Sequence, residues 1–474
     1  MADGLWLVPG APLPAGRGWR VWVSRRGNGA LEAPAATVRL ERREVQFTTR
    51  WEAIAGIPGF DRQAGCLEIE LQERNPGAAY EVSFPSVGPD PFQWRTLPER
   101  LRPAAASDGD GAALTIMVSS CFYRPNDAEG AYAAGLRELC RRNGVHLKLL
   151  VGDQIYQDWP LAMPLTPALA MFTARYETYW GDDPMRAALA LTPNLFVSDD
   201  HEYWNDYPER QFHLAHTWTA GLRERYGDMA RATYDFYQKA ANPAGATFSI
   251  IEVPPLSIFL ADSRHDRDPV SSIEPHFFGR AQWEAFTEWA AGRDGPAVLV
   301  IGQPLFQLPG DWKDHTLANF SADYARLWKT LGTILDRGHD VLVLTGDIHW
   351  GRYATTETAT GARLHELVAS PASNVAQGPF VGSRSGAGAP TKITTPIGQG
   401  VRVWSVATTT TDRVPTNDNN VSLVRFESGT NGRVRTRASI WRIRPVDTRW
   451  FWQPPPELTE PPLRMLFNTE FQLA

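Results

Sequence analysis

The sequence predicts an α/β protein in which a β-sandwich core flanked by helices follows a smaller all-β region. Three observations support this prediction. Residues 1–98 contain short strand-like runs and no helical pattern, whereas from residue 114 onward apolar runs alternate with helical stretches. A chain of 474 residues is also longer than one small core needs. We therefore expect an N-terminal β-sandwich domain over 1–98, a linker over 99–113 and a larger second domain over 114–474.

The N-terminal region has the pattern of a small Ig/Fn3-like sandwich. Its alternating, β-rich runs are separated by Gly, Pro and Asn, which favour turns. Several short strands of this kind are typical of two packed antiparallel sheets. The linker that follows is rich in Pro, Ala, Asp and Gly. The runs that we expect to form strands are "GWRVWVS", "ATVRLER", "REVQFTTRW", "CLEIELQE" and "AAYEVSF".

From residue 114 the strands change character, because their apolar runs are unbroken. Such runs are typical of strands buried on both faces, and their alternation with helices predicts a sheet core with helices outside. Residues 372–398, rich in Gly, Pro and Ser, are expected to form a long surface loop. Expected strands are "LTIMVSSC", "LKLLVGD", "NLFVSDDHE", "LSIFLADSR", "AVLVIGQP", "DVLVLTGDIH" and, in the tail, "VRVWSVATTT", "VSLVRFES" and "RVRTRASIWRI"; expected helices are 130–143, 166–190, 208–241, 280–292 and 320–337.

Composition and charge argue against several classes of function. The net charge is −6 and no basic run is present, which argues against nucleic-acid binding. No stretch reaches the roughly 18 apolar residues of a membrane span, and serine-hydrolase and P-loop motifs are absent. As written, the chain has no signal peptide and is expected to be cytoplasmic; a preceding signal would make it periplasmic or secreted. The three cysteines, Cys66, Cys121 and Cys140, cannot form a disulfide framework.

Polar side chains gather where the buried strands end, which is the edge where such folds place their sites. The first motif is "LLVGDQIYQD". Gly152 lets the chain turn, and Asp153 then projects from the strand end. Tyr156 lies one helical turn later and would face the same point. The alternative interpretation is a helix-capping aspartate followed by a core tyrosine.

Two further motifs follow later strands. "VSDDHEYWND" has four consecutive ionisable residues, which packing alone does not explain, although a solvated turn is the alternative. Within it, acidic neighbours would raise the proton affinity of His201, which suits a general acid for a leaving oxygen. In "LVLTGDIHWGRY", Asp347 and His349 alternate along an expected extended chain, so we expect them to project to the same side. A lone histidine there would more often be a core residue.

So many acidic groups at one edge need cations. Burying unpaired carboxylates costs several kcal/mol each, so paired metal ions are the expected solution. Two ions bridged by one carboxylate would balance the charge, activate a water molecule and clamp a phosphoryl group. Cys121, which ends its own strand, would be core on its own, but in this company it becomes a candidate thiolate ligand.

In their order and spacing the motifs resemble those of the PhoD-type alkaline phosphatases in the metallophosphoesterase superfamily. The matching residues read "SC…GDxIY…DDHExxN…ADSR…GQ…TGDIHW…ELVASP". The segment "YEVSFPSVG…FQWRTLP" is similar to that family's N-terminal β-sandwich, so the resemblance extends over the chain. It implies a metallophosphoesterase core and a phosphoric ester hydrolase in which a metal-bound hydroxide attacks phosphorus and His201 is the general acid.

The resemblance also implies a ligand set. The implied cofactors are iron (Fe3+) with Ca2+ or another divalent metal, because phenolate and thiolate favour a highly charged ion. Cys121 and Tyr156 would bind the iron, with Asp153 bridging the two ions. Asp200 stands where the superfamily has an asparagine ligand. The complete implied metal set is Cys121, Asp153, Tyr156, Asp200, Asn205, Asp347 and His349.

Three positions depart from the family pattern. Phe122 follows Cys121 where a polar residue is common, Asp206 replaces a second asparagine, and Pro304 follows Gln303 where a second glutamine is common. These departures bear on substrate preference and on the second metal, because the three liganding motifs are intact.

Other residues have two interpretations each. Arg264 is a candidate catalytic residue that would bind phosphate oxygens bidentately; alternatively it pairs with Asp262 or Asp266. Four tryptophans would either line a pocket for an apolar leaving group or form the core of the helical insertions. They are Trp159, Trp180, Trp204 and Trp218.

The sequence therefore predicts a metal-dependent hydrolase acting on a small-molecule phosphate ester or phosphodiester. One alternative is a phosphodiesterase with phospholipase D-like preference. Another is a non-catalytic metal-binding homologue that binds through its β-sandwich, which the intact motifs disfavour. The sequence leaves the oligomeric state open.

Overall fold

The structure is a computed structural model in which 14 segments of the chain are described. They are residues 4–27, 29–103, 113–127, 130–158, 169–243, 247–310, 315–349, 351–373, 389–390, 401–405, 407–408, 416–417, 419–444 and 463–474. In these segments, no helix combines the length and apolar character that crossing a membrane requires.

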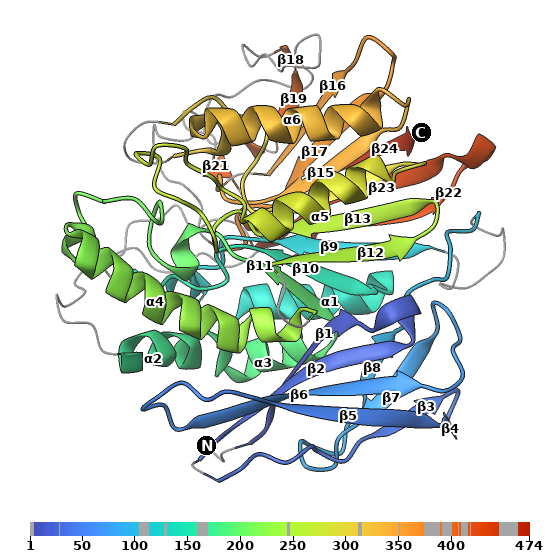
Figure 1. The fold of residues 1–474 in the computed structure, drawn as a ribbon. Helices are drawn as coiled ribbons and strands as arrows, with labels where there is room; N and C mark the ends of the chain where they lie inside the picture. The colour runs from blue at the N-terminus through green and yellow to red at the C-terminus, as the bar shows by residue number, and fades with distance from the viewer. Residues whose placement is uncertain are drawn as a thin grey trace.

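The N-terminal region forms two four-stranded antiparallel sheets, drawn in blue in Figure 1. Their strand orders are β1-β2-β6-β5 and β4-β3-β7-β8. All five predicted strand regions contain strands, but the prediction missed β1, whose sequence holds two prolines, and the short β8. That residues 1–98 form a separate domain stays a prediction. The strands are β1 (Trp6–Pro12), β2 (Gly18–Arg26), β3 (Thr37–Leu40), β4 (Arg43–Glu44), β5 (Phe47–Ile54), β6 (Arg62–Leu71), β7 (Ala79–Ser83) and β8 (Phe92–Arg95).

The rest of the chain builds two larger sheets with helices outside them, which confirms the predicted mixed α/β architecture (Figure 1). One sheet has six strands in the order β11-β10-β9-β22-β23-β24. Its strands are β9 (Leu114–Ser119), β10 (Leu147–Val151), β11 (Asn194–Val197), β22 (Asn419–Ser428), β23 (Val434–Arg444) and β24 (Arg464–Leu473).

The other sheet has eight strands in the order β12-β13-β14-β15-β17-β16-β19-β18. Its strands are β12 (Phe248–Val253), β13 (Leu256–Ala261), β14 (Ala297–Ile301), β15 (Val341–Thr345), β16 (Arg352–Glu357), β17 (Arg363–Val368), β18 (Ala389–Pro390) and β19 (Arg402–Ser405). A short pair, β20 (Ala407–Thr408) and β21 (Thr416–Asn417), stands apart from both large sheets.

Six α-helices lie in the described segments. Two predicted helices are shorter than expected: 166–190 divides into α2 and α3 before Pro184, and 208–241 becomes a helix only at Ala220. Most of the predicted 372–398 loop lies outside the described residues. The helices are α1 (Ala131–Asn143), α2 (Leu169–Trp180), α3 (Asp183–Ala190), α4 (Ala220–Tyr237), α5 (Arg280–Ala291) and α6 (Ser321–Leu335).

The strands at the centre of both sheets bury both faces, as their unbroken apolar sequences predict. In β9, alternate residues Leu114, Ile116 and Val118 join one apolar cluster with Val298 and Val300 of β14 in the other sheet. This cluster is the interior of the sandwich. On the outer side of the eight-stranded sheet, a second cluster packs α5 and α6 against β13, β14 and β15.

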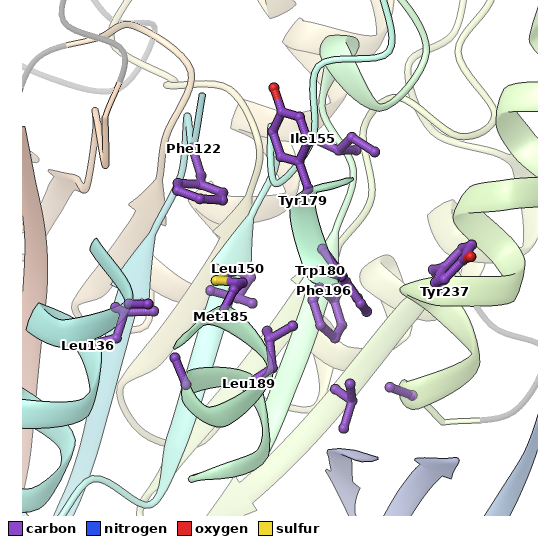
Figure 2. Packing of buried hydrophobic residues seen from close by; sticks show 14 of the residues in the cluster. Phe122, Leu136, Leu150, Ile155, Tyr179, Trp180, Met185, Leu189, Phe196 and Tyr237 are labelled. Atoms are coloured by element: carbon purple, nitrogen blue, oxygen red, sulfur yellow. The ribbon is translucent and has the colours of Figure 1, made fainter. Parts of the chain in front are cut away.

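A third apolar cluster lies on the outer side of the six-stranded sheet and extends to the N-terminal strands. Figure 2 shows its central part, where Trp180 of α2 stacks on Phe196 of β11 with ring centroids 5.4 Å apart. Trp22 of β2 is fully buried in the same cluster and makes an edge-to-face contact with Trp180 at 6.3 Å. The N-terminal sheets and the larger sheets therefore share one core.

This shared core can be tested with Trp22→Ala. Removing a fully buried tryptophan costs about 3–5 kcal/mol, so the free energy of unfolding in urea should fall by that amount. Trp218→Ala is the matched control, because Trp218 is 49% exposed and its loss should cost under about 1 kcal/mol. Equal effects of the two substitutions would contradict a core that joins β2 to α2.

Candidate metal centre

Four strands from both sheets end at one edge, and each delivers a candidate ligand there. Cys121 follows β9, Asp153 follows β10, Asp200 follows β11 and Asp347 follows β15. The chains approach closely at this edge: a Cβ atom at Gly152 would collide with the side chain of Asp199, and φ there is +88°. Only glycine allows both the contact and this backbone conformation.

The backbone at this edge is strained. Of the nine non-glycine residues with positive φ in the described segments, five are at or beside the site, with φ between 54° and 69°. Such conformations cost roughly 1–3 kcal/mol each and occur where surrounding structure imposes them, often at functional sites. The expectation that Asp347 and His349 lie on an extended chain is therefore wrong, because both have left-handed backbones beyond the end of β15. The five residues are Cys121, Asp153, Asp206, Asp347 and His349.

The first candidate ligand group joins Cys121, Asp153 and His349, whose ligand atoms lie within 4.8 Å of one another. The Cys121 thiol donates to Asp153 Oδ2 at 3.4 Å and accepts from Ser370 Oγ at 3.1 Å. The Tyr156 hydroxyl donates to the same Asp153 oxygen at 3.3 Å and lies 3.4 Å from His349 Nε2. The structure thus brings four predicted ligands together, although no helix carries Tyr156.

Two further groups extend this cluster. Asp153, Asp200 and His201 form the second, and Asp199, Asp200 and Asp347 form the third. Asp153 is common to the first two groups and Asp200 to the last two, so the three groups form one continuous array. Such shared carboxylates are suited to bridging neighbouring ions.

Two of the buried acidic groups of this array keep an oxygen without a hydrogen-bond partner among the described residues. In the described part of the chain, Asp199 Oδ2 and Asp200 Oδ1 have no hydrogen-bond partner although both are buried. Burial, reinforced by Asp153, raises the pKa of the Cys121 thiol well above its usual value, and burial likewise raises the pKa of Asp153. Bound cations would reverse both shifts and satisfy the open oxygens. The donor set therefore fits metal ions.

His201 is held by a carboxylate that the sequence analysis did not identify. Its Nδ1 lies 2.8 Å from Oδ1 of the buried Asp158, and its ring packs on that of Tyr156 with centroids 4.0 Å apart. Burial alone would lower the pKa of His201, but the charges of Asp158, Asp200 and Asp153 raise it well above the usual value. His201 is thus oriented and favoured in its protonated form.

Glu202 organises the loops under the array. Its carboxylate accepts backbone N–H groups from Asp153 at 2.8 Å, Gln154 at 2.7 Å and Asp199 at 2.9 Å. The Gln238 amide of the segment after α4 donates to it at 3.2 Å. Burial raises the pKa of Glu202 to about 8, which these hydrogen bonds oppose. Glu202 therefore fixes the first two motifs relative to each other.

Arg264 lies fully buried behind the array. Its Nε donates to Asp199 Oδ1 at 2.5 Å and its Nη1 donates to the carbonyl oxygen of Tyr207 at 2.8 Å. Its ion-pair partners are therefore Asp199 and, at 3.9 Å, Asp206, whereas Asp262 accepts only its backbone N–H. Gln303 extends the support, since its amide donates to Asp347 Oδ2 at 3.1 Å.

The other residues singled out in the sequence differ in where they lie relative to the array. Asn205 donates its backbone N–H to Asp158 Oδ2 at 2.9 Å, at the edge of the array. Trp180 and Trp204 are fully buried, Trp218 is half exposed, and Trp159 lies outside the described residues. Asp158 could have been noticed as the second aspartate of "GDQIYQD", and Ser370 lies in the quoted motif "ELVASP", but the sequence analysis assigned neither residue a role at the site.

Comparisons with known proteins show the family and the fold of the chain. A family profile described as PhoD-like phosphatase matches residues 116–396. A solved structure titled "Structure of PhoD" covers 92% of this chain and 86% of its own, with a TM-score of 0.57 and 15% identity. A weaker neighbour is "GAP50 the anchor in the inner membrane complex of Plasmodium", with 11% identity, a TM-score of 0.37, and 70% and 85% coverage. No curated protein sequence matches. The chain belongs to the PhoD-like phosphatase family.

Proposed function

We propose that the protein is a metal-dependent phosphomonoesterase of the alkaline phosphatase D type. Family membership implies a phosphoesterase hydrolase, and the ester class is our proposal. The observation that carries the metal-dependent hydrolysis is the continuous array in which Asp153 and Asp200 each belong to two candidate ligand groups. An array of this kind suits two ions acting together on one phosphoryl group.

The donor chemistry suggests how two ions would divide the array. Cys121, Tyr156 and His349 surround one side of Asp153, and thiolate and phenolate donors favour Fe3+. Asp199, Asp200 and Asp347 offer only carboxylate oxygens, which suit Ca2+ or another hard divalent ion, with Asn205 nearby. When bound, such ions supply an activated water and neutralise phosphoryl charge. The supporting observation is the pair of open carboxylate oxygens on Asp199 and Asp200.

His201 is our candidate for the general acid. His201 Nδ1 is hydrogen-bonded to Asp158, so a protonated ring has its second N–H at Nε2. The Nε2 proton can then be transferred to the oxygen of the departing alcohol. Asp158 keeps the ring oriented and balances its charge, as a carboxylate partner does for other catalytic histidines. Arg264 donates a hydrogen bond to Asp199. It would therefore influence the substrate indirectly, by positioning that carboxylate and through the positive charge of its guanidinium group.

The proposal is tested by metal analysis of the purified protein together with ester assays. We expect stoichiometric metal and hydrolysis of 4-nitrophenyl phosphate faster than that of bis(4-nitrophenyl) phosphate. Preferred hydrolysis of the diester would replace the monoesterase assignment with a phosphodiesterase. A transition-metal content well below one ion per chain, together with no hydrolysis of either ester, would refute the proposal that the protein is an enzyme.

Asp153→Asn tests the bridging role. Because Asp153 is common to two ligand groups, the substitution should lower the content of both metals, measured by mass spectrometry after dialysis. Asp158→Asn is the matched control, since Asp158 is equally buried but belongs to none of the groups found in the described residues. Wild-type metal content in Asp153→Asn would show that the bridge is assigned to the wrong residue.

His201→Gln tests the general acid. Loss of such a group typically costs about 10²–10⁴-fold in rate, and the cost grows as the leaving alcohol becomes less acidic. We therefore expect kcat to fall more for an alkyl phosphate than for 4-nitrophenyl phosphate, with metal content retained. Asp158→Asn should show the same leaving-group trend at smaller magnitude. An equal loss for both esters would argue that His201 does not protonate the leaving group.

A further inference from the structure

A second buried aspartate holds a second histidine beside the array. Asp206 Oδ2 lies 2.6 Å from His315 Nδ1. The other oxygen of the same carboxylate, Asp206 Oδ1, accepts the backbone N–H of His315 at 2.9 Å. The amide of Gln211 also donates to Asp206 Oδ2, at 3.0 Å. His315 is therefore fixed at both its backbone and its ring by one carboxylate.

This pair is connected to the candidate ligands from two directions. The backbone N–H of Asp206 donates to Asp200 Oδ2 at 2.5 Å. The amide of Gln303 donates both to the carbonyl oxygen of His315 at 3.4 Å and to Asp347 Oδ2 at 3.1 Å. One residue therefore separates His315 from each of two carboxylates in the third ligand group.

The Nδ1 edge of the His315 imidazole faces the buried carboxylate of Asp206. Nδ1 faces Asp206, whose side chain is fully buried, while the side chain of His315 is 18% exposed. Nε2 is the ring nitrogen that does not face Asp206. His201 has a comparable setting, with Nδ1 on the buried Asp158 and a side chain that is 13% exposed.

The identity of residue 206 agrees with this arrangement. A carboxylate offers two acceptor oxygens, and Asp206 uses one for the His315 backbone N–H and the other for the ring. An asparagine would place an NH2 group against one of these two donors. The aspartate that departs from the family pattern at this position is thus the residue that His315 requires.

We propose that His315 is a further substrate-contacting residue, whose Nε2–H donates a hydrogen bond to a phosphoryl oxygen, and that Asp206 is its positioning residue. The inference rests on the proposed function, because it places the phosphoryl group at the third ligand group. A ring that donates from both nitrogens to anionic partners would make two charge-assisted hydrogen bonds.

The test measures binding of inorganic phosphate to the metal-loaded protein by calorimetry, which requires no turnover. His315→Asn keeps a donor near Nδ1 but does not reach the Nε2 position, whereas His315→Gln does. We expect His315→Asn to weaken phosphate binding by about tenfold or more, the usual scale for losing a hydrogen bond to a charged group. His315→Gln should restore much of the affinity, and Asp206→Asn should lie between them.

The matched control is His276→Asn. His276 forms a comparable pair with Asp323, its Nδ1 lying 3.0 Å from that carboxylate, but belongs to the segment before α5. Metal content and circular dichroism check folding, and if His315→Asn does not fold, the phosphate affinity of Asp206→Asn decides. Wild-type phosphate affinity in the folded His315 and Asp206 variants, or equal losses in His315→Asn and His276→Asn, would overturn the inference.

Steady-state kinetics separate this inference from the proposed function. In His315→Asn, KM for 4-nitrophenyl phosphate should rise together with the inhibition constant of phosphate, without the leaving-group trend expected of His201→Gln. If wild-type protein hydrolyses phosphate esters but His315→Asn leaves both constants unchanged, only the role of His315 fails. If wild-type protein neither hydrolyses an ester nor binds phosphate, both proposals fail.

Discussion

Burial of negative charge at the common edge of two sheets is the constraint on which the rest of this structure depends. The carboxyl groups of Asp153, Asp199, Asp200, Glu202 and Asp206 are all at most 5% exposed. Concentrated charges of one sign cannot remain without water unless hydrogen bonds, cations or protons compensate them. The loops around the edge are organised to provide such compensation.

The compensation comes in two forms. Fixed donors satisfy some of the carboxylate oxygens: three backbone N–H groups bind Glu202, and Arg264 binds Asp199 Oδ1. Other oxygens, Asp199 Oδ2 and Asp200 Oδ1, have no hydrogen-bond partner among the described residues. This division explains why positively charged side chains stay behind the array. They orient its members, and the open oxygens of Asp199 and Asp200 stay within the candidate ligand groups.

Much of this arrangement could be predicted from the sequence. Unbroken apolar runs predicted the central strands. The polar residues at the ends of "LKLLVGD" and "DVLVLTGDIH" predicted which strand ends would meet. The conformation at those ends could not be predicted, because left-handed backbone at Asp347 and His349 depends on neighbours distant in the sequence. His315 was missed for the same reason, since it contacts the site through the fold and carries no local motif. Ser370 lies in the motif "ELVASP", but its contact with Cys121 likewise depends on the fold.

The shared core connects the N-terminal sheets with this strained edge. Phe122 and Ile155 follow Cys121 and Asp153 by one and two residues, and both belong to the apolar cluster that also contains Trp22 of β2. Phe122 stacks on Tyr132 of α1 with ring centroids 4.5 Å apart. An apolar residue after Cys121 therefore anchors a left-handed turn in the core, where a polar residue would have to be buried without water. Backbone strain persists only when the surrounding structure imposes it, and here part of the packing around the candidate metal site comes from the N-terminal strands.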